Sequence, residues 1–95
     1  MPLTPFDDES FVGGMEAILR IVENNKDGLL RRMENTDKEK NPILYYSYDC
    51  ALCYLVYKTV KKENDPEMNY VIDNLIKRVV KNLDIMKVEG NKDDK

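Results

Sequence analysis

Residues 41–62 read NPILYYSYDCALCYLVYKTVKK, and apolar or aromatic side chains surround the whole circumference of the helix that this pattern predicts. Only Ser47 and Asp49 interrupt the run between Ile43 and Tyr57. A helix that is hydrophobic on all sides has to be covered by other protein. We therefore expect residues 41–62 to form either the central element of a bundle or a helix that a partner helps to cover.

The composition is typical of one globular domain with a thin core. The chain has 95 residues, of which 42% are hydrophobic and 35% charged, and its net charge is −3. Nucleic acids and anionic membranes attract concentrated positive charge, so a chain with pI near 5.0 is a weak general binder of either. No signal-like segment opens the sequence, and its longest nearly uncharged run is shorter than the roughly 20 residues that cross a bilayer. We expect a cytoplasmic protein that does not enter a membrane, with reduced cysteines.

The N-terminal third predicts a helix and then a break. Thr4 and Pro5 form a helix start, and the apolar stripe that follows has 3.6-residue spacing, which predicts a helix over residues 5–24. Gly13 and Gly14 lie inside it and indicate either a loose first turn or a close crossing of another helix. Residues 24–28 are poor helix formers, so we predict a break followed by a short helix. The alternative is one long helix through this weak point.

The C-terminal third predicts one more helix. Asp65 and Pro66 start it after a very short turn, so it must lie antiparallel to the helix over residues 41–62. It presents a wide apolar stripe, and Gly90 is expected to end it. The sequence therefore predicts an all-α fold, an antiparallel bundle of three principal helices with a short extra helix between the first and second. Residues 1–90 form this single domain, and residues 91–95 form a polar tail.

Cys50 and Cys53 are the one motif with potential chemistry. Redox and zinc sites of the Cys-x-x-Cys type use a helix N-terminus or a loop, whereas this pair lies in the middle of a predicted helix. The chain has no histidine and no second cysteine pair that would complete a tetrahedral site. We interpret both thiols as core side chains, and we expect neither a metal nor a cofactor.

Asp49 lies among aromatic residues of the same helix. It is expected either to face solvent or to bond a tyrosine hydroxyl or a cation such as Arg31 or Arg32. A catalytic carboxylate usually shares protons with a second titrating group, and the sequence shows no such pair. Glycine-rich phosphate loops and nucleophile elbows are also missing, so we do not expect an enzyme.

Five of the six tyrosines lie in residues 41–62. Tyrosine suits surfaces that are buried on one side and wet on the other, either at a protein interface or at the rim of a small core. We predict a non-catalytic module that binds another protein as an adaptor, complex subunit or inhibitor, with a homodimer as one form of it. Tyr54 is expected to be the most exposed tyrosine. The expected contact residues are aromatic or long and apolar, with lysines at the rim: Tyr46, Tyr54, Tyr57, Phe11, Met15, Lys58 and Lys61.

The basic residues of the last two helices suggest an alternative, a nucleic-acid-associated regulatory protein. On one face they would form a patch that contacts phosphates. They are Lys58, Lys61, Lys62, Lys77, Arg78 and Lys81. Acidic residues lie between them, and neither an aromatic platform nor a turn-helix recognition pair is evident. Protein binding is therefore the favoured prediction, and nucleic acid is the less favoured partner.

Overall fold

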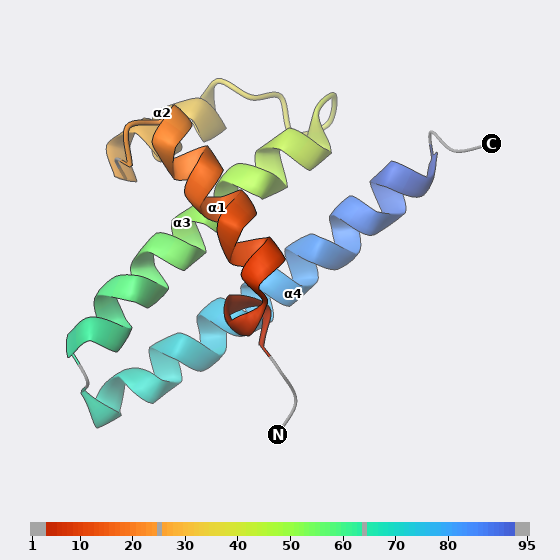
Figure 1. The fold of residues 1–95 in the computed structure, drawn as a ribbon. Helices are drawn as coiled ribbons and strands as arrows, with labels where there is room; N and C mark the ends of the chain where they lie inside the picture. Colours follow the sequence, from red (N-terminus) through yellow and green to blue (C-terminus); the bar gives the residue numbers. More distant parts are fainter. Residues whose placement is uncertain (1–3, 25, 64, 93–95) are drawn as a thin grey trace.

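The structure is a computed structural model that describes residues 4–24, 26–63 and 65–92, and these residues are helical with no strand among them (Figure 1). The predicted all-α bundle is confirmed, and so is the short extra helix between the first and second principal helices. The elements are, in order, the 3-10 helix η1 (Pro5–Asp7), α1 (Glu9–Ile21), α2 (Lys26–Glu34), α3 (Pro42–Glu63), the 3-10 helix η2 (Pro66–Met68) and α4 (Asn69–Lys92).

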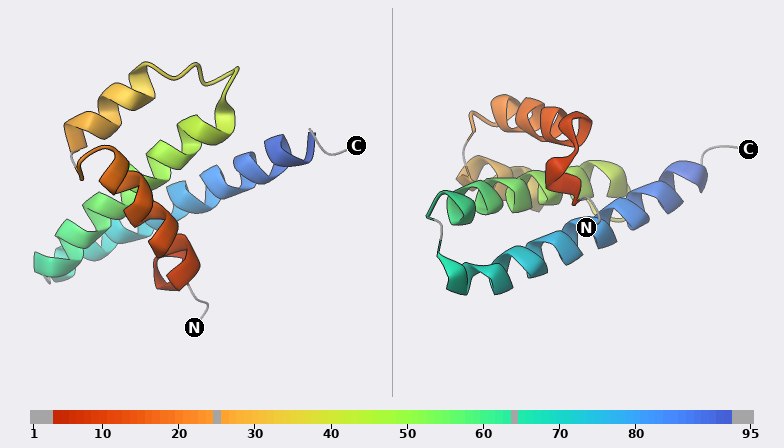
Figure 2. Two further views of the ribbon diagram at one scale, coloured as in Figure 1. Left: turned by 45° about the horizontal axis from the view of Figure 1, so that its top comes forward. Right: turned by 60° about the horizontal axis from the view of Figure 1, so that its bottom comes forward.

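Helix α3 is the central element of the bundle. It packs against α1, α2 and α4, and α1 and α4 lie on opposite sides of it (Figure 2). Side chains that are buried follow one another around the helix, as Tyr48, Asp49, Cys50 and Ala51 do over four consecutive positions. This cover from several directions is the physical reason why α3 is hydrophobic on all sides.

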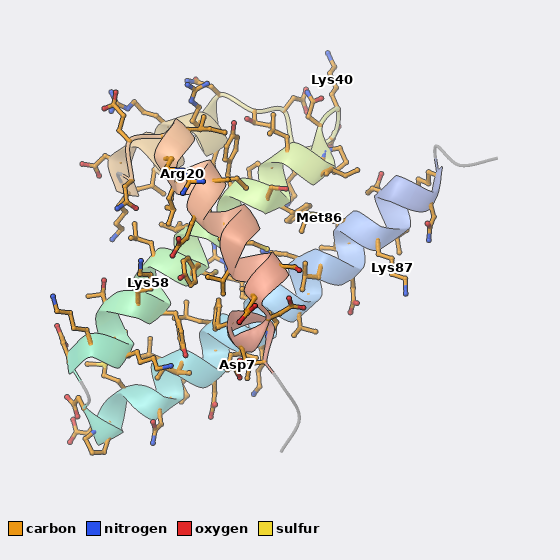
Figure 3. The ribbon with its side chains drawn as sticks, in the orientation of Figure 1. Asp7, Arg20, Lys40, Lys58, Met86 and Lys87 are labelled. Carbon is orange, nitrogen blue, oxygen red and sulfur yellow. The ribbon has the colours of Figure 1, made fainter. Side chains whose placement is uncertain are left out.

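Helices α3 and α4 form an antiparallel hairpin. Met86 lies on the side of α4 that faces α3, with its sulfur 3.5 Å from the Ser47 hydroxyl, and Lys87 points to the other side (Figure 3). The prediction that α4 ends at Gly90 is wrong, because the helix continues to Lys92. Gly90 does not adopt the left-handed conformation that ends a helix. The rest of the predicted tail, residues 93–95, lies outside the described residues.

The first predicted helix is divided in two. Thr4 donates to the Asp7 carboxylate from its N–H (3.3 Å) and its hydroxyl (2.9 Å), which fixes η1. Asp8 is extended and caps α1 by accepting from the N–H groups of Ser10 (2.9 Å) and Phe11 (3.3 Å). The expected single helix from residue 5 is therefore wrong at its start. The break at Asp8 turns η1 away from the axis of α1 toward α3 and α4, and Phe6 is buried against Tyr54 and Tyr57 of α3.

The end of α1 makes the predicted break. Glu23 (φ 61°) and Asn24 (φ 53°) are both left-handed, so the chain turns away from the helix axis before α2 begins at Lys26. The one-helix alternative is therefore wrong. A close helix crossing at Gly13 and Gly14 is also wrong, because a Cβ added at either glycine would meet no atom within 4 Å.

Candidate functional site

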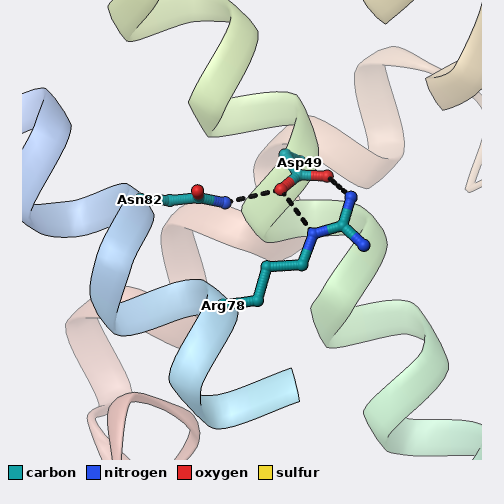
Figure 4. A network of polar contacts seen from close by, with 3 residues as sticks. All are labelled: Asp49, Arg78 and Asn82. Carbon is teal, nitrogen blue, oxygen red and sulfur yellow. Dashed lines mark hydrogen bonds and ion pairs between the residues drawn. The ribbon is translucent and has the colours of Figure 1, made fainter. Parts of the chain in front are cut away.

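A buried polar network joins the two helices of the hairpin (Figure 4). Asp49 on α3 is 4% exposed, and both of its oxygens are occupied. The Nε of Arg78 donates to one oxygen at 2.8 Å, and its terminal nitrogen bonds the other. The Nδ2 of Asn82 donates to the first oxygen at 2.6 Å. The partner of Asp49 is a cation, as one alternative predicted, but it is Arg78 rather than Arg31 or Arg32, because Asp49 faces α4. The solvent-facing alternative is wrong, because Asp49 is buried.

The residue pattern of α4 already indicates a buried polar contact. Asn82 lies on the apolar stripe between Val79 and Met86, where a hydrophobic residue is the rule. A buried amide at such a position requires a polar partner. That partner is the carboxylate of Asp49. The same carboxylate raises the pKa of Arg78, mainly through the hydrogen bond between Arg78 and Asp49. Because Arg78 and Asn82 lie on α4 and Asp49 on α3, the network ties the two helices of the hairpin together.

The two thiols are core side chains, as predicted. Cys50 and Cys53 are free and buried. Burial raises the pKa of Cys50 to about 12, partly offset by a hydrogen bond with Asn82, and burial raises the pKa of Cys53 to about 11. Without a bound metal, thiols in this state hold little of the thiolate form, which is the reactive nucleophile. Within the described ranges, no three or more Cys, Asp or Glu side chains are grouped so that they could hold a metal ion.

A hollow of about 450 Å³ lies on the other face of α3, and we call it the aromatic–lysine hollow. It is lined by residues from η1, α1 and the second half of α3, which meet because Phe6 of η1 packs on α3. These residues are Phe6, Val12, Tyr54, Tyr57, Lys58, Lys61 and Lys62. Four of the seven are aromatic or apolar and three are lysines, so the hollow joins an apolar wall to a positive rim.

The aromatic rings form the wall of the hollow. Phe6 stacks on Tyr57 with ring centroids 4.2 Å apart and planes 17° apart, and its centroid lies 6.1 Å from that of Tyr54. The hydroxyl of Tyr54 donates to the Glu16 carboxylate at 3.1 Å. Burial and this bond both raise the pKa of Tyr54. The wall is therefore fixed by contacts within the chain, while Tyr57 stays half-buried at the opening.

The lysines form the rim of the hollow. Lys58 lies 5.3 Å from the centre of the Tyr54 ring and 3.9 Å from the Glu16 carboxylate. Lys61 lies 5.3 Å from the centre of the Tyr57 ring, and this tyrosine raises the pKa of Lys61. All three lysines are exposed. A cation near an aromatic face is attracted to the ring, and the ammonium groups of Lys58 and Lys61 lie beside the wall in this way.

The structure brings together four of the seven predicted contact residues. Tyr54, Tyr57, Lys58 and Lys61 all line the hollow, and Phe11 is half-buried beside it, with its ring 6.4 Å from that of Phe6. Phe6 and Val12 are not among the predicted contact residues, and Lys62 was named only in the basic face. The one local signal was Pro5, which indicates a helix start just before Phe6.

The other predicted contacts lie elsewhere. Tyr46 is near the start of α3, edge-on to Tyr45 and 5.8 Å from Lys38. Met15 is buried in the core. The prediction that Tyr54 is the most exposed tyrosine is wrong, because α1 and Phe6 cover it to 6% exposure. Tyr70 on α4 is 75% exposed instead.

A comparison with protein families, curated proteins and solved structures finds no match to this chain. In the part of the chain that the structure describes, no helix is both long and apolar enough to cross a membrane. The fold therefore defines the class, an all-α bundle, and the function has to be argued from its surface.

Proposed function

We propose that this chain is a non-catalytic module that binds another protein, as an adaptor, a complex subunit or an inhibitor. The aromatic–lysine hollow carries the proposal, because it places half-exposed Tyr57 beside three exposed lysines. Tyrosines at the edge of a well-packed cluster are typical anchors in interfaces, and rim charges select the partner. Two carboxylates, Glu16 and Asp7, lie near enough to act on these lysines. The rim keeps an excess of positive charge and suits an acidic partner surface.

Two observations support a non-catalytic function. The thiols of Cys50 and Cys53 are held protonated by burial, and the buried carboxylate of Asp49 is bound to Arg78. A general acid or base has to reach its substrate and change its protonation state. The two thiols and the Asp49 carboxylate are the most chemically distinctive groups in the core. The thiols pack in the core, and the carboxylate is held in a fixed ion pair.

A different protein is a more favourable partner for the hollow than a second copy of this chain. In a symmetric homodimer each residue of the interface meets the same patch on its partner. A homodimer through the hollow would bring its lysines close to the same lysines, which like-charge repulsion opposes. A homodimer through another face stays part of the proposal, as does a cytoplasmic location.

Nucleic acid is the second candidate partner. The predicted basic face includes Arg78, but the carboxylate of Asp49 neutralises the charge of its guanidinium. Lys58 is also close to Glu16. Both contacts reduce the positive charge that the face offers, which favours protein over nucleic acid.

The experiment compares three forms of the protein in quantitative affinity capture from the native source. These are the wild type, the Lys61→Glu, Lys62→Glu variant of the hollow, and a control variant, Lys77→Glu, Lys87→Glu, with the same charge change on exposed positions of α4. A specific partner should be lost with the first variant and kept with the control. A partner kept by both variants, or salt-sensitive nucleic acid lost with both, contradicts the proposal. Sedimentation equilibrium of the purified wild type measures self-association.

A further inference from the structure

A second hollow of about 470 Å³ lies between the end of α1, helix α2 and the first turns of α3. We call it the arginine hollow, because Arg31 and Arg32 line it. Its α3 residues are Leu44 and Tyr48, whereas the aromatic–lysine hollow begins at Tyr54 and extends to Lys62. The helical rise places Leu44 about 25 Å from the lysines near the other end of α3. The two hollows are therefore separate surfaces.

Large apolar side chains are exposed at the arginine hollow. Ile21 is 66% exposed and Leu44 is 46% exposed, and both border a floor made by the buried side chains of Val22 and Tyr48. Apolar groups that continue from the core out to the surface mark an interaction site more strongly than isolated ones do. The packing of α1 and α2 against α3 leaves this part of the core without a cover.

Leu44 extends this apolar surface around the start of α3. It also lines a neighbouring hollow of about 490 Å³, together with Ile43, which is 44% exposed. Leu44 is thus shared by two hollows that also present exposed Ile21 and Ile43. A surface of this kind accommodates the apolar face of a helix from another protein.

The charges of the arginine hollow identify the chemistry of its occupant. Arg31 and Arg32 are exposed, and among the described residues neither side chain forms an ion pair or a hydrogen bond. Glu23 is the one carboxylate among the lining residues, so the lining has excess positive charge. Cations are favourable near the end of a helix such as α2, but this does not account for their place beside exposed Ile21 and Leu44. A guanidinium binds a carboxylate through paired hydrogen bonds, which favours aspartate or glutamate in the occupant.

We propose that the arginine hollow binds a segment of a second protein that presents carboxylates beside aliphatic or aromatic side chains, in the manner of an acidic amphipathic helix. This inference does not depend on what the aromatic–lysine hollow binds. If both hollows are occupied, the chain joins two proteins at opposite ends of α3 and acts as a bridging adaptor.

A random peptide library displayed on phage tests the proposal without knowledge of the natural partner. Peptides of about 16 residues are long enough for four helical turns. Selection on the full wild-type chain should enrich peptides that combine aspartate or glutamate with leucine, isoleucine or phenylalanine. These peptides should bind the Arg31→Glu, Arg32→Glu variant about tenfold more weakly or worse, because the variant loses charge-assisted hydrogen bonds and gains repulsion. Selection on that variant should enrich lysine and arginine instead.

Three comparisons keep the result decisive. The Lys77→Glu, Lys87→Glu variant should bind the selected peptides as the wild type does. Ile21→Ser and Leu44→Ser, at exposed positions, should each weaken binding several-fold, and unchanged far-UV circular dichroism confirms that each variant is folded. If the double glutamate variant does not fold, Arg31→Gln, Arg32→Gln replaces it.

Several results overturn the proposal. They are a selection without acidic enrichment, peptides that bind the arginine variants as tightly as the wild type, the absence of any arginine-dependent peptide, and a homodimer in which Ile21 and Leu44 become buried against a second copy. Selected peptides should also leave capture through the aromatic–lysine hollow intact. Failure of the present proposal is therefore distinguishable from failure of the proposed function.

Discussion

The guanidinium of Arg78 on α4 holds both carboxylate oxygens of Asp49 on α3, although the two side chains differ in exposure, at 53% for the arginine and 6% for the aspartate. Arg78 can regain water when its partner is removed, whereas Asp49 cannot. The pair therefore stabilises the hairpin mainly by providing hydrogen bonds to the carboxylate of Asp49, which water does not reach.

Arg78→Met tests this asymmetry. It leaves one bond from Asn82 to a buried carboxylate, so the free energy of unfolding should fall by about 2 kcal/mol, less than for a fully buried pair because Arg78 is half in water. Urea denaturation measures the change. Lys77→Met, one position away and exposed, should stay within about 0.5 kcal/mol of the wild type. Equal effects of the two substitutions would contradict the role given to Arg78.

Gly14→Ala should stabilise the protein. Gly14 lies inside α1 with open space around its missing Cβ, so alanine adds helix propensity without a clash. The expected gain is about 0.5–1 kcal/mol in the free energy of unfolding. Ala17→Gly in the same helix is the matched control and should change stability in the opposite direction. A loss of stability in Gly14→Ala would mean that another element approaches α1 at this point.

Glu23→Gly should also stabilise the protein, for a different reason. The left-handed backbone of Glu23 (φ 61°) strains a residue that carries a Cβ, and glycine removes this strain at the cost of a more flexible unfolded chain. The net gain should be about 0.5–1 kcal/mol, measured by thermal unfolding. Lys77→Gly, in the interior of α4, should instead lose about 1 kcal/mol.

The buried thiols make stability depend on alkaline pH. Burial raises the pKa of Cys50 to about 12 and of Cys53 to about 11 in the folded state, above the ordinary thiol value of 9.0. The unfolded chain therefore releases protons first as pH rises, so the folded state retains more protons and loses stability through this window. The slope should approach about 1.4 kcal/mol per pH unit per thiol.

Denaturant unfolding between neutral pH and pH 10.5 measures this effect. The Cys50→Ala, Cys53→Ala variant is less stable at neutral pH because it loses packing, but it should decline less steeply with pH than the wild type. Parallel pH profiles for the two proteins would show that the thiols are not the groups responsible.

Phe6→Ala tests the N-terminal contribution to the aromatic–lysine hollow. Phe6 is 6% exposed and stacks on Tyr57, so its removal should cost about 3 kcal/mol and expose the tyrosine. Chemical denaturation measures the stability, and tyrosine fluorescence quenching by iodide measures the exposure. Tyr70→Ala removes an aromatic ring that is 75% exposed and should have little effect on the stability. Unchanged quenching in Phe6→Ala would indicate that η1 does not cover Tyr57.

The sequence by itself determined the helices and their order. Apolar side chains all around residues 41–62 identified α3 as the helix that other elements must cover. The short turn before Pro66 made the hairpin antiparallel. These features depend on residues within a few positions of one another, and helical periodicity and capping are local properties. Even so, Gly90 failed as a stop, because glycine ends a helix only when the backbone there turns left-handed.

The tertiary structure alone decided which side chains meet. Asp49 pairs with Arg78 because of the register and rotation of α4 against α3, and Tyr54 is buried because Asp8 interrupts the first helix and η1 places Phe6 over it. Such contacts join residues 29 to 48 positions apart. Their geometry depends on how whole helices pack, which periodicity along one helix does not contain. The sequence therefore defined the faces of the helices, and packing determined which face met which.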